Sequence, residues 1–596
     1  RIIIKTDSNI KVSITFYLDN EAIHWGNDTY WKDTVVGNKG DIIYLASKTL
    51  TTHQSLAASS IVNTTYSGKI IKEEKQIGIT YKFALKAMEV ANFARYVNIL
   101  VNKESDKNIS ELLKNSIKNV TLLRKNNFDY YVNSNEKYFN KVWDKSDVEI
   151  SGCDIDQQGI RYCIFQLETN YHGYAEDNNI GAKGLTGEAY SGHAFWDSET
   201  YCLPYYLFSN QKAALNLLMF RYNTLYEAKQ RAKMLDCEGA CYPIATRNGY
   251  EGCTLWQHAS CQFQPTTAVG YAIYHYMNVY SDHNFMQKYG LEMLLEICKF
   301  LLSRGQYDKE GNFGYYGVMG PDEFQMMVNN NTYTNFMAKK MFDYLFTIIG
   351  SRKYKTEALY KKCGYTPSLI KKMKLASSKM IILYDKETKL FEQHDGFYKL
   401  PHIDIDKIPV TDFPLYSHWS YDRIYRNDII KQPDVLMFMF LYPGDFTYEQ
   451  IKANYEFYEP RCLHESSLSP SIHSILASYL GKEKEAMDFF GFATRLDLDD
   501  YNRNTLEGLH MTSIAAAWMN IIYGFLGLRS DTSDVSIAPK LPKRWKSYKV
   551  NLLLNGSKVG IFVDCNKIKF SLKGKPISLI VNGQKIDIVN ELEVTR

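Results

Sequence analysis

An acidic side chain on a Gly-Pro turn is the feature of this chain best suited to chemistry. The turn Gly320-Pro321-Asp322-Glu323-Phe324 precedes the amide-rich run Asn329-Asn330-Asn331-Thr332-Tyr333-Thr334-Asn335. Apolar neighbours can keep such a carboxyl protonated, and the carboxyl can then donate its proton to the leaving oxygen of a sugar. Taken alone, a GPDE tetrapeptide is more often a plain turn with a solvated acid.

Two further loops carry groups that suit a sugar. Trp196 and Asp197 lie in the segment GHAFWDSE, where an indole can stack on a pyranose face while the carboxylate accepts bonds from hydroxyl groups. Lys431 and Gln432 lie in the segment KQPD, and they offer an ammonium and an amide to an oxygen-rich ligand. Each segment also has an interpretation without a ligand. The first can be a helix start with its Trp in the core, and the second can be an exposed helix start.

A third pair of segments suits an anion. Ser466 and Ser467 lie in the run HESSLSP, with Pro470 just inside an expected helix. Paired hydroxyls and free backbone N–H groups at a helix start can bind an anion. The segment NTLEGLH, which ends at His510, follows further along the chain. Ordinary N-capping is the alternative interpretation.

The sequence gives less support for a metal site, a nucleotide-binding loop or a serine nucleophile. Cys237, Cys241, Cys253, His258 and Cys261 cluster in sequence, but their spacing matches no paired zinc element, so no metal site is predicted. The evenly spaced glycines 181, 184 and 187 do not follow a strand-to-helix switch, which argues against a nucleotide loop. No Walker-type loop and no G-x-S-x-G elbow is present.

The composition is that of an ordinary globular protein. Of the 596 residues, 45% are hydrophobic and 23% charged, and the net charge is only +4, so the Lys-rich runs are interpreted as solvated helix faces and not as a nucleic-acid surface. The 46 Tyr suit walls that contact sugars, although AT-rich codon bias explains them equally well. Eleven Cys without a framework and no apolar run near 18 residues predict a cytoplasmic protein with no membrane partner. Since the chain starts at Arg1, we expect a fragment or a processed form.

The chain changes character along its length. Residues 1–90 alternate apolar and polar side chains in short runs, which predicts antiparallel strands. Residues 91–147 have a charged, helical pattern typical of a linker. Residues 148–530 form a series of amphipathic and fully apolar helices, such as 513–526, that fit a two-layered helical toroid. Residues 531–596 predict a small β domain, with hairpin turns at the Asn-Gly pairs 555–556 and 582–583.

Together these segments resemble glycoside hydrolase family 65, the family of maltose, kojibiose, nigerose and trehalose phosphorylases. The motifs that carry the resemblance occur in the same order and spacing: GHAFWDSE (192–199), GACYP (239–243), GPDEF (320–324), KQPDVL (431–436), SSLSPSIHS (466–474) and EGLH (507–510). The resemblance implies an N-terminal β-sandwich, a helical linker, an (α/α)6-barrel catalytic domain and a C-terminal β-sheet domain. Here the sandwich is short, as though its first part were missing. The resemblance also allows a homodimer.

The implied reaction is inverting phosphorolysis of an α-linked glucosyl disaccharide, giving β-D-glucose 1-phosphate and the acceptor sugar. Glu323 matches the family's general acid. Trp196, Asp197, Lys431 and Gln432 match residues that hold the glucosyl unit, and Ser466, Ser467 and His510 match the phosphate side. The resemblance implies no cofactor, because inorganic phosphate is a substrate. A phosphorylase needs hydrogen-bond donors where a hydrolase needs a second carboxylate, since a carboxylate would repel the phosphate dianion.

The departures from the family pattern leave alternatives open. Pro433 stands where relatives often carry Ala, and Phe324-Gln325 replaces a commoner Tyr-His. The loop 249–267 differs from that of maltose phosphorylases, which suggests an α-1,3 or α-1,2 acceptor geometry. An inverting α-glucoside hydrolase of the same fold is the main alternative, with Glu465 as its base. A carbohydrate-binding protein without activity is the third.

Overall fold

The computed structural model describes residues 1–21, 29–103, 108–532 and 534–596. The chain divides into two compact units, Arg1–Lys141 and Val142–Arg596, and each is described by itself. Helix α2 (Phe128–Ser146) spans the boundary between them.

The N-terminal unit consists of two antiparallel sheets with a shared apolar core. One sheet has the order β1-β8-β5-β4-β3 and the other β2-β7-β6. Ile43 and Leu45 of the first sheet and Ile77 and Ile79 of the second belong to the same buried cluster. The bounds are β1 (Ile2–Lys5), β2 (Ile10–Asp19), β3 (Trp31–Lys39), β4 (Ile42–Thr49), β5 (Ser55–Asn63), β6 (Gly68–Lys72), β7 (Gln76–Leu85) and β8 (Val90–Asn102).

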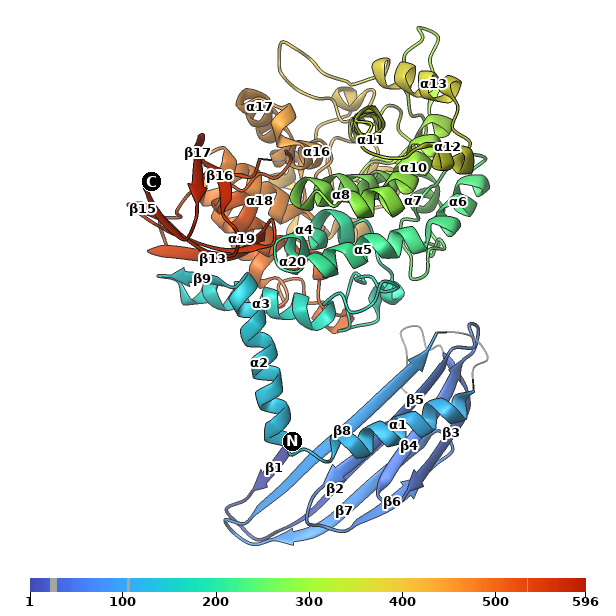
Figure 1. Ribbon diagram of the computed structural model, residues 1–596, viewed down its shortest axis with the longest axis vertical. Coiled ribbons are helices and arrows are strands. Elements are labelled where there is room, and N and C mark those ends of the chain that lie inside the picture. The colour runs from blue at the N-terminus through green and yellow to red at the C-terminus, as the bar shows by residue number, and fades with distance from the viewer. Residues whose placement is uncertain (22–28, 104–107, 533) are drawn as a thin grey trace. The chain divides into compact units, whose positions relative to one another are not determined.

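Strand β8 corrects the helical pattern expected from about residue 90. Its buried and exposed residues alternate at the start, where Ala91 and Phe93 enter the core between exposed neighbours, which is the period of a strand. Helix α1 (Ile109–Leu123) then packs on β5 and β8 (Figure 1), and the hydroxyls of Ser59 and Ser116 form a buried hydrogen bond 2.8 Å long. The expected helical linker therefore begins after the sheet and not inside it.

The larger unit is built on a closed ring of inner helices. Within the described residues, each inner helix contacts the next and the last returns to the first. Most of their residues are buried, as the apolar sequence of 513–526 predicted. The inner helices are η2–α4 (Ser198–Leu207), α8 (Gln264–Tyr280), α11 (Thr332–Gly350), α16 (Val435–Leu441), α18 (Ser469–Tyr479) and α20–η10 (Met511–Phe525).

A second layer of helices alternates with the first along the chain. This alternation of outer and inner helices is the (α/α)6 barrel implied by the resemblance, and the outer helices surround the inner ones in Figure 1. The outer helices are α3 (Asp154–Asn170), α5 (Gln211–Asn223) with α6 (Leu225–Met234), α10 (Leu291–Arg304), α13 (Pro367–Ser378), α17 (Tyr448–Tyr458) and α19 (Glu483–Arg495).

The loops that enter the inner helices contain the predicted site residues. Asp197 precedes η2, Glu323 lies in the loop before α11, and Lys431 lies just before α16. Ser467 precedes α18 and His510 precedes α20. Because neighbouring inner helices begin with these loops, their positive N-terminal ends face the region in which the loops meet.

The C-terminal strands form two small sheets beside the barrel. One has the order β18-β15-β14-β13-β9 and the other β12-β16-β17, so the short strand β9 (Val148–Ser151) joins the C-terminal sheet by pairing with β13. Trp545 packs edge-on against Phe490 of α19 and Phe525, which ties this sheet to the barrel. The other bounds are β12 (Ser536–Ile537), β13 (Ser547–Leu554), β14 (Ser557–Asp564), β15 (Lys567–Lys573), β16 (Ile577–Val581), β17 (Gln584–Ile588) and β18 (Glu591–Thr595).

Both Asn-Gly pairs form the predicted hairpin turns. Asn555 and Gly556 have φ values of 50° and 77°, and Asn582 and Gly583 have values of 49° and 84°. A two-residue turn with positive φ at both positions matches the twist of the flanking strands. Among the helices of the described residues, none is long and apolar enough to span a bilayer.

Candidate active site

The loop that carries Glu323 is fixed by its neighbour Asp322. The Asp322 side chain is fully buried, and its Oδ1 accepts hydrogen bonds from the backbone N–H groups of Phe324 (3.1 Å) and Lys431 (2.9 Å). Its Oδ2 accepts a bond of 2.9 Å from Gln393 Nε2. One carboxyl group therefore connects the loop before α11 to the loop before α16.

This connection places the ammonium group of Lys431 on Glu323. Lys431 Nζ lies 2.5 Å from Glu323 Oε2, and the two side chains are 21% and 29% exposed. The residue predicted as a proton donor and a residue predicted as a sugar ligand thus form one ion pair. Both still reach the solvent-accessible space of the site.

The ion pair changes the expected protonation of Glu323. Burial alone would raise the pKa of this carboxyl, but the charges of Lys431 and His258 outweigh it, and the pKa of Glu323 lies below its usual value. Apolar neighbours alone can keep such a carboxyl protonated, but in the chain without substrate a nearby positive charge counteracts them. Its main source is the lysine 108 residues further along, which the local sequence could not reveal.

Close packing under the loop explains two other residues of the motifs. A Cβ atom on Gly320 would lie 2.1 Å from Asp434 Oδ2, so only glycine fits there. Asp434 is buried and accepts hydrogen bonds from Asn331 at 3.0 and 3.1 Å. Gln432 Nε2 donates to the carbonyl of Pro321, while its Oε1 is buried without a hydrogen-bond partner in the described part of the chain. The amide predicted to hold sugar thus already supports the Glu323 loop.

Asp197 and Trp196 differ in how far they are open to a ligand. Asp197 is half-buried, its Oδ2 accepts a short hydrogen bond from Thr512, and burial raises its pKa to about 6. Trp196 is only 4% exposed and packs edge-on against Tyr201 and Tyr333. The indole is therefore a wall of the core in this structure, and its face is not free to stack on a sugar.

The loop that carries Ser466 and Ser467 is supported from behind by a buried hydroxyl. Both serines are half-buried, and Ser466 Oγ accepts from the backbone N–H of Leu468 at 3.2 Å. Ser469 Oγ lies 2.8 Å from His464 Nδ1, 3.4 Å from His473 Nδ1 and 3.3 Å from Cys462 Sγ. The hydroxyl of Ser469 is the centre of this network, which fixes the loop at the start of α18.

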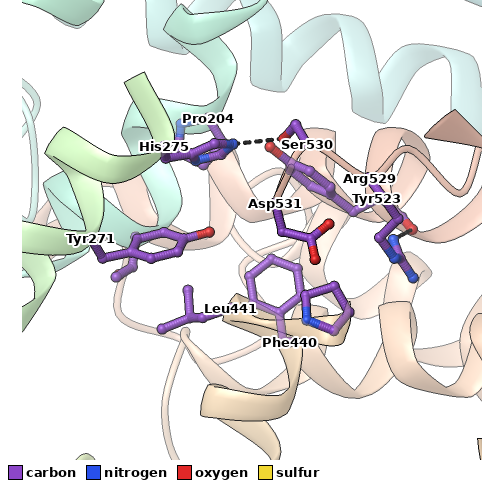
Figure 2. A pocket seen from close by; sticks show the side chains of 11 residues that line it. Pro204, Tyr271, His275, Phe440, Leu441, Tyr523, Arg529, Ser530 and Asp531 are labelled. Carbon is purple, nitrogen blue, oxygen red and sulfur yellow. Dashed lines mark hydrogen bonds between the residues drawn. The ribbon is translucent and has the colours of Figure 1, made fainter. Parts of the chain in front are cut away.

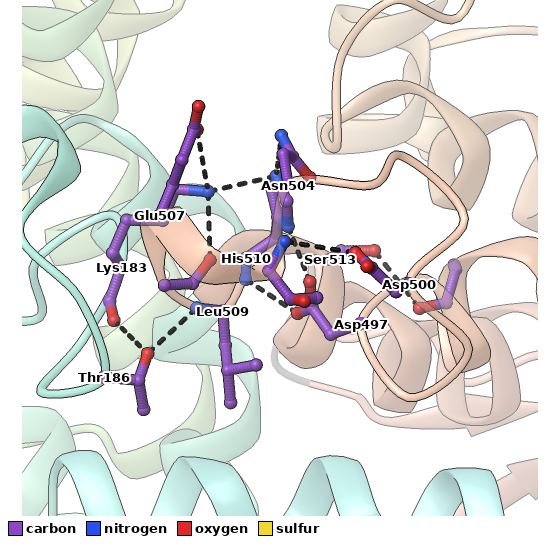
Figure 3. Close-up of polar contacts among 12 residues, drawn as sticks. Lys183, Thr186, Asp497, Asp500, Asn504, Glu507, Leu509, His510 and Ser513 are labelled. Carbon is purple, nitrogen blue, oxygen red and sulfur yellow. Dashed lines mark hydrogen bonds and ion pairs between the residues drawn. The ribbon is translucent and has the colours of Figure 1, made fainter.

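His510 is held in one orientation by a carboxylate and a buried lysine (Figure 3). Its Nδ1 lies 2.6 Å from Asp497 Oδ1, and its Nε2 lies 3.1 Å from Lys183 Nζ. Since Asp497 is an acceptor and the lysine ammonium a donor, the ring carries its proton on Nδ1 and accepts at Nε2. Lys183 is 2% exposed, and burial lowers its pKa.

Lys183 and Asp497 were not predicted from the sequence. Lys183 lies between two of the evenly spaced glycines 181, 184 and 187. A Cβ atom on Gly187 would lie 2.2 Å from the carbonyl oxygen of Glu507, so this glycine lets the loop pack on the segment before His510. Thr186 Oγ1 strengthens this contact by accepting from the Leu509 N–H at 2.9 Å. The glycine spacing was thus a signal for close backbone packing.

Two carboxylates also lie at this end of the barrel. Glu465 Oε1 accepts from the backbone N–H of Leu415 at 2.5 Å, and burial raises the pKa of Glu465. Glu507 is 38% exposed and lies 4.0 Å from Lys183 Nζ. Oε1 of Glu465 is bound to the backbone, while its Oε2 is buried without a hydrogen-bond partner among the described residues, and Glu507 lies beside a cation.

A small cavity lies between the inner helices η2–α4, α8, α16 and α20–η10. It has a volume of about 20 Å³, enough for a single water molecule, and is lined by His275, Tyr523 and Ser530, with a bond of 2.8 Å between His275 Nε2 and Ser530 Oγ (Figure 2). Tyr523 follows His510 by 13 residues, which corresponds to roughly 15–20 Å of helix. This cavity is therefore separate from the Glu323 site and too small for a sugar.

Comparison with known proteins decides the family. The model of the glycosyl hydrolase family 65 central catalytic domain matches residues 161–519, and that of the family's C-terminal domain matches residues 528–588. The chain belongs to glycosyl hydrolase family 65. This membership confirms the resemblance seen in the motifs and the (α/α)6-barrel architecture implied by it.

Several relatives of the chain are named as phosphorylases. Maltose phosphorylase of Bacillus subtilis (strain 168) is 33% identical over 98% of this chain and 77% of its own length. Alpha,alpha-trehalose phosphorylase of Thermoanaerobacter brockii is 36% identical over 83% of this chain, which spans 64% of that relative. A solved structure named "Putative kojibiose phosphorylase from human microbiome" is 54% identical with a TM-score of 0.95, over all of this chain and 79% of the other. The predicted enzyme class, disaccharide phosphorylases of family 65, is confirmed.

Proposed function

We propose that the protein catalyses inverting phosphorolysis of an α-linked glucosyl disaccharide and releases β-D-glucose 1-phosphate. Glu323 protonates the glycosidic oxygen as the bond to C1 breaks. An oxygen of inorganic phosphate attacks C1 from the opposite face, which inverts the configuration at that carbon. The reaction requires sugar and phosphate as small-molecule partners and no other cofactor.

The proposal rests on a difference in the side chains that two groups of loops supply. The loops before α11 and α16 supply the Glu323–Lys431 pair. The loops before α18 and α20 supply two serine hydroxyls, the N-terminal ends of two helices, and a histidine bonded to a buried lysine. Hydroxyls, an ammonium group and helix N-termini suit a phosphate dianion.

Hydrolysis is the second candidate because carboxylates lie nearby. An inverting hydrolase needs a free base roughly 6.5–9.5 Å from the acid to activate water. Glu465 is held by the backbone of the segment that begins at Leu415, and Glu507 faces Lys183. The contact with Lys183 argues against Glu507 as that base, whereas Glu465 keeps an Oε2 without a hydrogen-bond partner among the described residues and remains the hydrolase candidate. The donors of the loops before α18 and α20 favour phosphate as the nucleophile.

The acceptor is proposed to be a glucose unit joined through its 2-hydroxyl. The sequence of the loop 249–267 suggested an α-1,2 or α-1,3 linkage. The 54% identical structure is named for kojibiose, the α-1,2-linked disaccharide, and this supports the first of the two. The relatives named for maltose and trehalose are less similar, at 33% and 36% identity.

The test is turnover of a panel of α-glucobioses with and without inorganic phosphate. We expect glucose 1-phosphate only when phosphate is present, with kojibiose as the best substrate, and proton NMR of the fresh product should show the β anomer. Equal rates in both buffers, with glucose as the only glycosyl product, would establish the hydrolase instead. Glu465→Gln and Glu507→Gln then identify its base.

A further inference from the structure

The general acid proposed above is ionised in the chain without substrate. Glu323 Oε2 lies 2.5 Å from Lys431 Nζ, a distance typical of a charge-assisted hydrogen bond. A carboxylate in such a pair cannot donate a proton. The reaction nevertheless requires that Glu323 carry a proton when the glycosidic bond breaks.

Lys431 dominates the positive charge that faces Glu323. His258 of the short helix α7 (Trp256–Cys261) is the other nearby positive contribution. Two carboxyl groups, Asp322 next to it in the chain and Asp197 from the loop before η2, oppose the ionisation of Glu323. Among the described residues, the other titratable groups that face Glu323 are neutral at pH 7: Tyr190, Cys253 and Tyr425.

Removing the ammonium group would therefore shift Glu323 toward its neutral form. Without Lys431, Glu323 would face two carboxyl groups in a site where burial already raises its pKa. A positive charge within about 4–6 Å of a carboxyl group favours its ionised form. Removal of that charge favours the neutral acid. The state of Glu323 thus depends on where the Lys431 side chain points.

The backbone of Lys431 is bonded to the Glu323 loop, whereas its long side chain has rotatable bonds by which it can reorient. The backbone N–H is fixed on Asp322 Oδ1 at 2.9 Å, and Asp322 is itself fully buried. The ammonium group has three donors on a flexible four-carbon stem, and it is 21% exposed on the side of the site. Sugar hydroxyls offer acceptors for those donors.

We propose that Lys431 acts as a proton gate: the disaccharide draws its ammonium group away from Glu323, and the sugar binds with uptake of one proton by that carboxylate. This inference rests on the proposed phosphorolysis and adds the step that prepares the acid. The role belongs to Lys431 in addition to any contact it makes with the glucosyl unit.

The proton is conserved over one turnover. Solvent supplies it to the Glu323 carboxylate as the sugar binds, and Glu323 passes it to the glycosidic oxygen as the C1–O bond breaks. HPO₄²⁻ supplies the electron pair of the new C1–O bond, and the proton of its remaining hydroxyl returns to solvent when glucose 1-phosphate leaves as a dianion. No redox step or further reactant is needed.

Calorimetry of sugar binding in the absence of phosphate tests the gate. The probe is kojibiose, or the α-glucobiose that the turnover panel selects, titrated at pH 7 into buffers with different ionisation enthalpies. We expect uptake of about one proton by the wild type, none by Glu323→Gln, and markedly less than one by Lys431→Met, because Glu323 is already protonated there. Lys484→Met, which changes a 91% exposed lysine, is the matched control and should retain the full uptake.

Kinetics provides a second measurement that does not depend on heat. The pH at which kcat/KM falls with rising pH reports the pKa of Glu323 in the free enzyme. The pH at which kcat falls reports its pKa in the enzyme–substrate complex. For the wild type, we expect kcat/KM to fall at a lower pH than kcat does. In Lys431→Met the kcat/KM profile should move to higher pH and approach the kcat profile.

The outcomes separate this inference from the proposed function. If no α-glucobiose gives glucose 1-phosphate, the proposed function fails. If phosphorolysis occurs but the sugar binds without proton uptake, or the two pH profiles coincide in the wild type, the gate alone is refuted.

Discussion

Replacing Asp322 with alanine should impair both activity and stability, because this carboxyl group holds the two loops that carry the Glu323–Lys431 pair. It accepts hydrogen bonds from the N–H groups of Lys431 and Phe324 and from Gln393 Nε2. The side chain is fully buried, so water does not reach these donors in the native protein. Alanine leaves all three without their acceptor.

The magnitude follows from those three donors. Each buried donor left without a partner costs about 1–3 kcal/mol, so the loss is roughly 3–9 kcal/mol, with the lower values expected if water enters the space. The unit Val142–Arg596 has 455 residues (596 − 141), and at about 2.1 cal/mol/K per residue its unfolding entropy is near 1 kcal/mol/K. The melting temperature should fall by about 3–9 °C. A displacement of Glu323 by about 1 Å should lower kcat on the order of 10²-fold.

Asp322→Asn is the matched control. The asparagine Oδ1 can still accept from both backbone N–H groups, and only the bond from Gln393 Nε2 is lost. We expect a loss of about 1–3 kcal/mol and a much smaller effect on kcat than for alanine. Thermal denaturation and phosphate-dependent turnover measure the two effects. The reasoning is refuted if Asp322→Ala retains nearly the wild-type kcat while folded, or if the asparagine variant loses as much activity as the alanine variant.

Three further changes test other parts of the site. Glu323→Gln should lower phosphorolysis by about 10³-fold or more without loss of folding, because the leaving oxygen is no longer protonated; unchanged turnover would remove Glu323 from the mechanism. Lys183→Met should raise the KM for phosphate by about tenfold or more and leave the KM for the disaccharide nearly unchanged, and an effect on the disaccharide alone would place Lys183 on the sugar side. Asp197→Asn should abolish sugar binding yet stabilise the fold at neutral pH. Burial raises the folded pKa of Asp197 from 3.8 to about 6, so the native state binds more protons than the unfolded state and stability falls as the pH rises between these values. The variant should therefore gain on the order of 2–3 kcal/mol over the wild type above pH 6 and about nothing at pH 3.8, as denaturation at both pH values would show.

Much of the architecture could be predicted because local patterns agreed with the fold. The run 513–526 is apolar on all sides and forms an inner helix, and the two Asn-Gly pairs form the turns of the C-terminal hairpins. Strand β8 was missed because its exposed face carries Val97, Ile99 and Val101, which hide the alternation expected of a strand with one polar face.

The site was predicted in part, for a reason that lies in the barrel topology. The sequence revealed the motifs in the loops before the inner helices. It did not reveal which of these loops lie close together in the fold. The pairing of Lys431 with Glu323 reverses the protonation expected from the GPDE turn alone, and Lys183 reaches His510 across 327 residues of sequence. Electrostatic states depend on such long-range neighbours, so residue types in one motif could not predict them.

The N-terminal ends of the inner helices have two opposite effects on catalysis, and the Glu323–Lys431 pair can reconcile them. Helix N-termini favour anions, by about 0.3–1 kcal/mol for a nearby charge at each terminus, which helps to bind a phosphate dianion. The same ends favour the ionised form of every carboxyl group beside them, including the general acid. Burial raises the pKa of Asp322 to about 7 and that of Asp197 to about 6, and in their ionised forms both groups make ionisation of Glu323 less favourable. With Lys431 on Glu323 the free enzyme keeps the acid ionised, and in the proposed gate the movement of Lys431 to the sugar leaves burial and the two carboxyl groups to favour the neutral acid. An enzyme built this way would hold a protonated acid only while a sugar is bound to receive the proton.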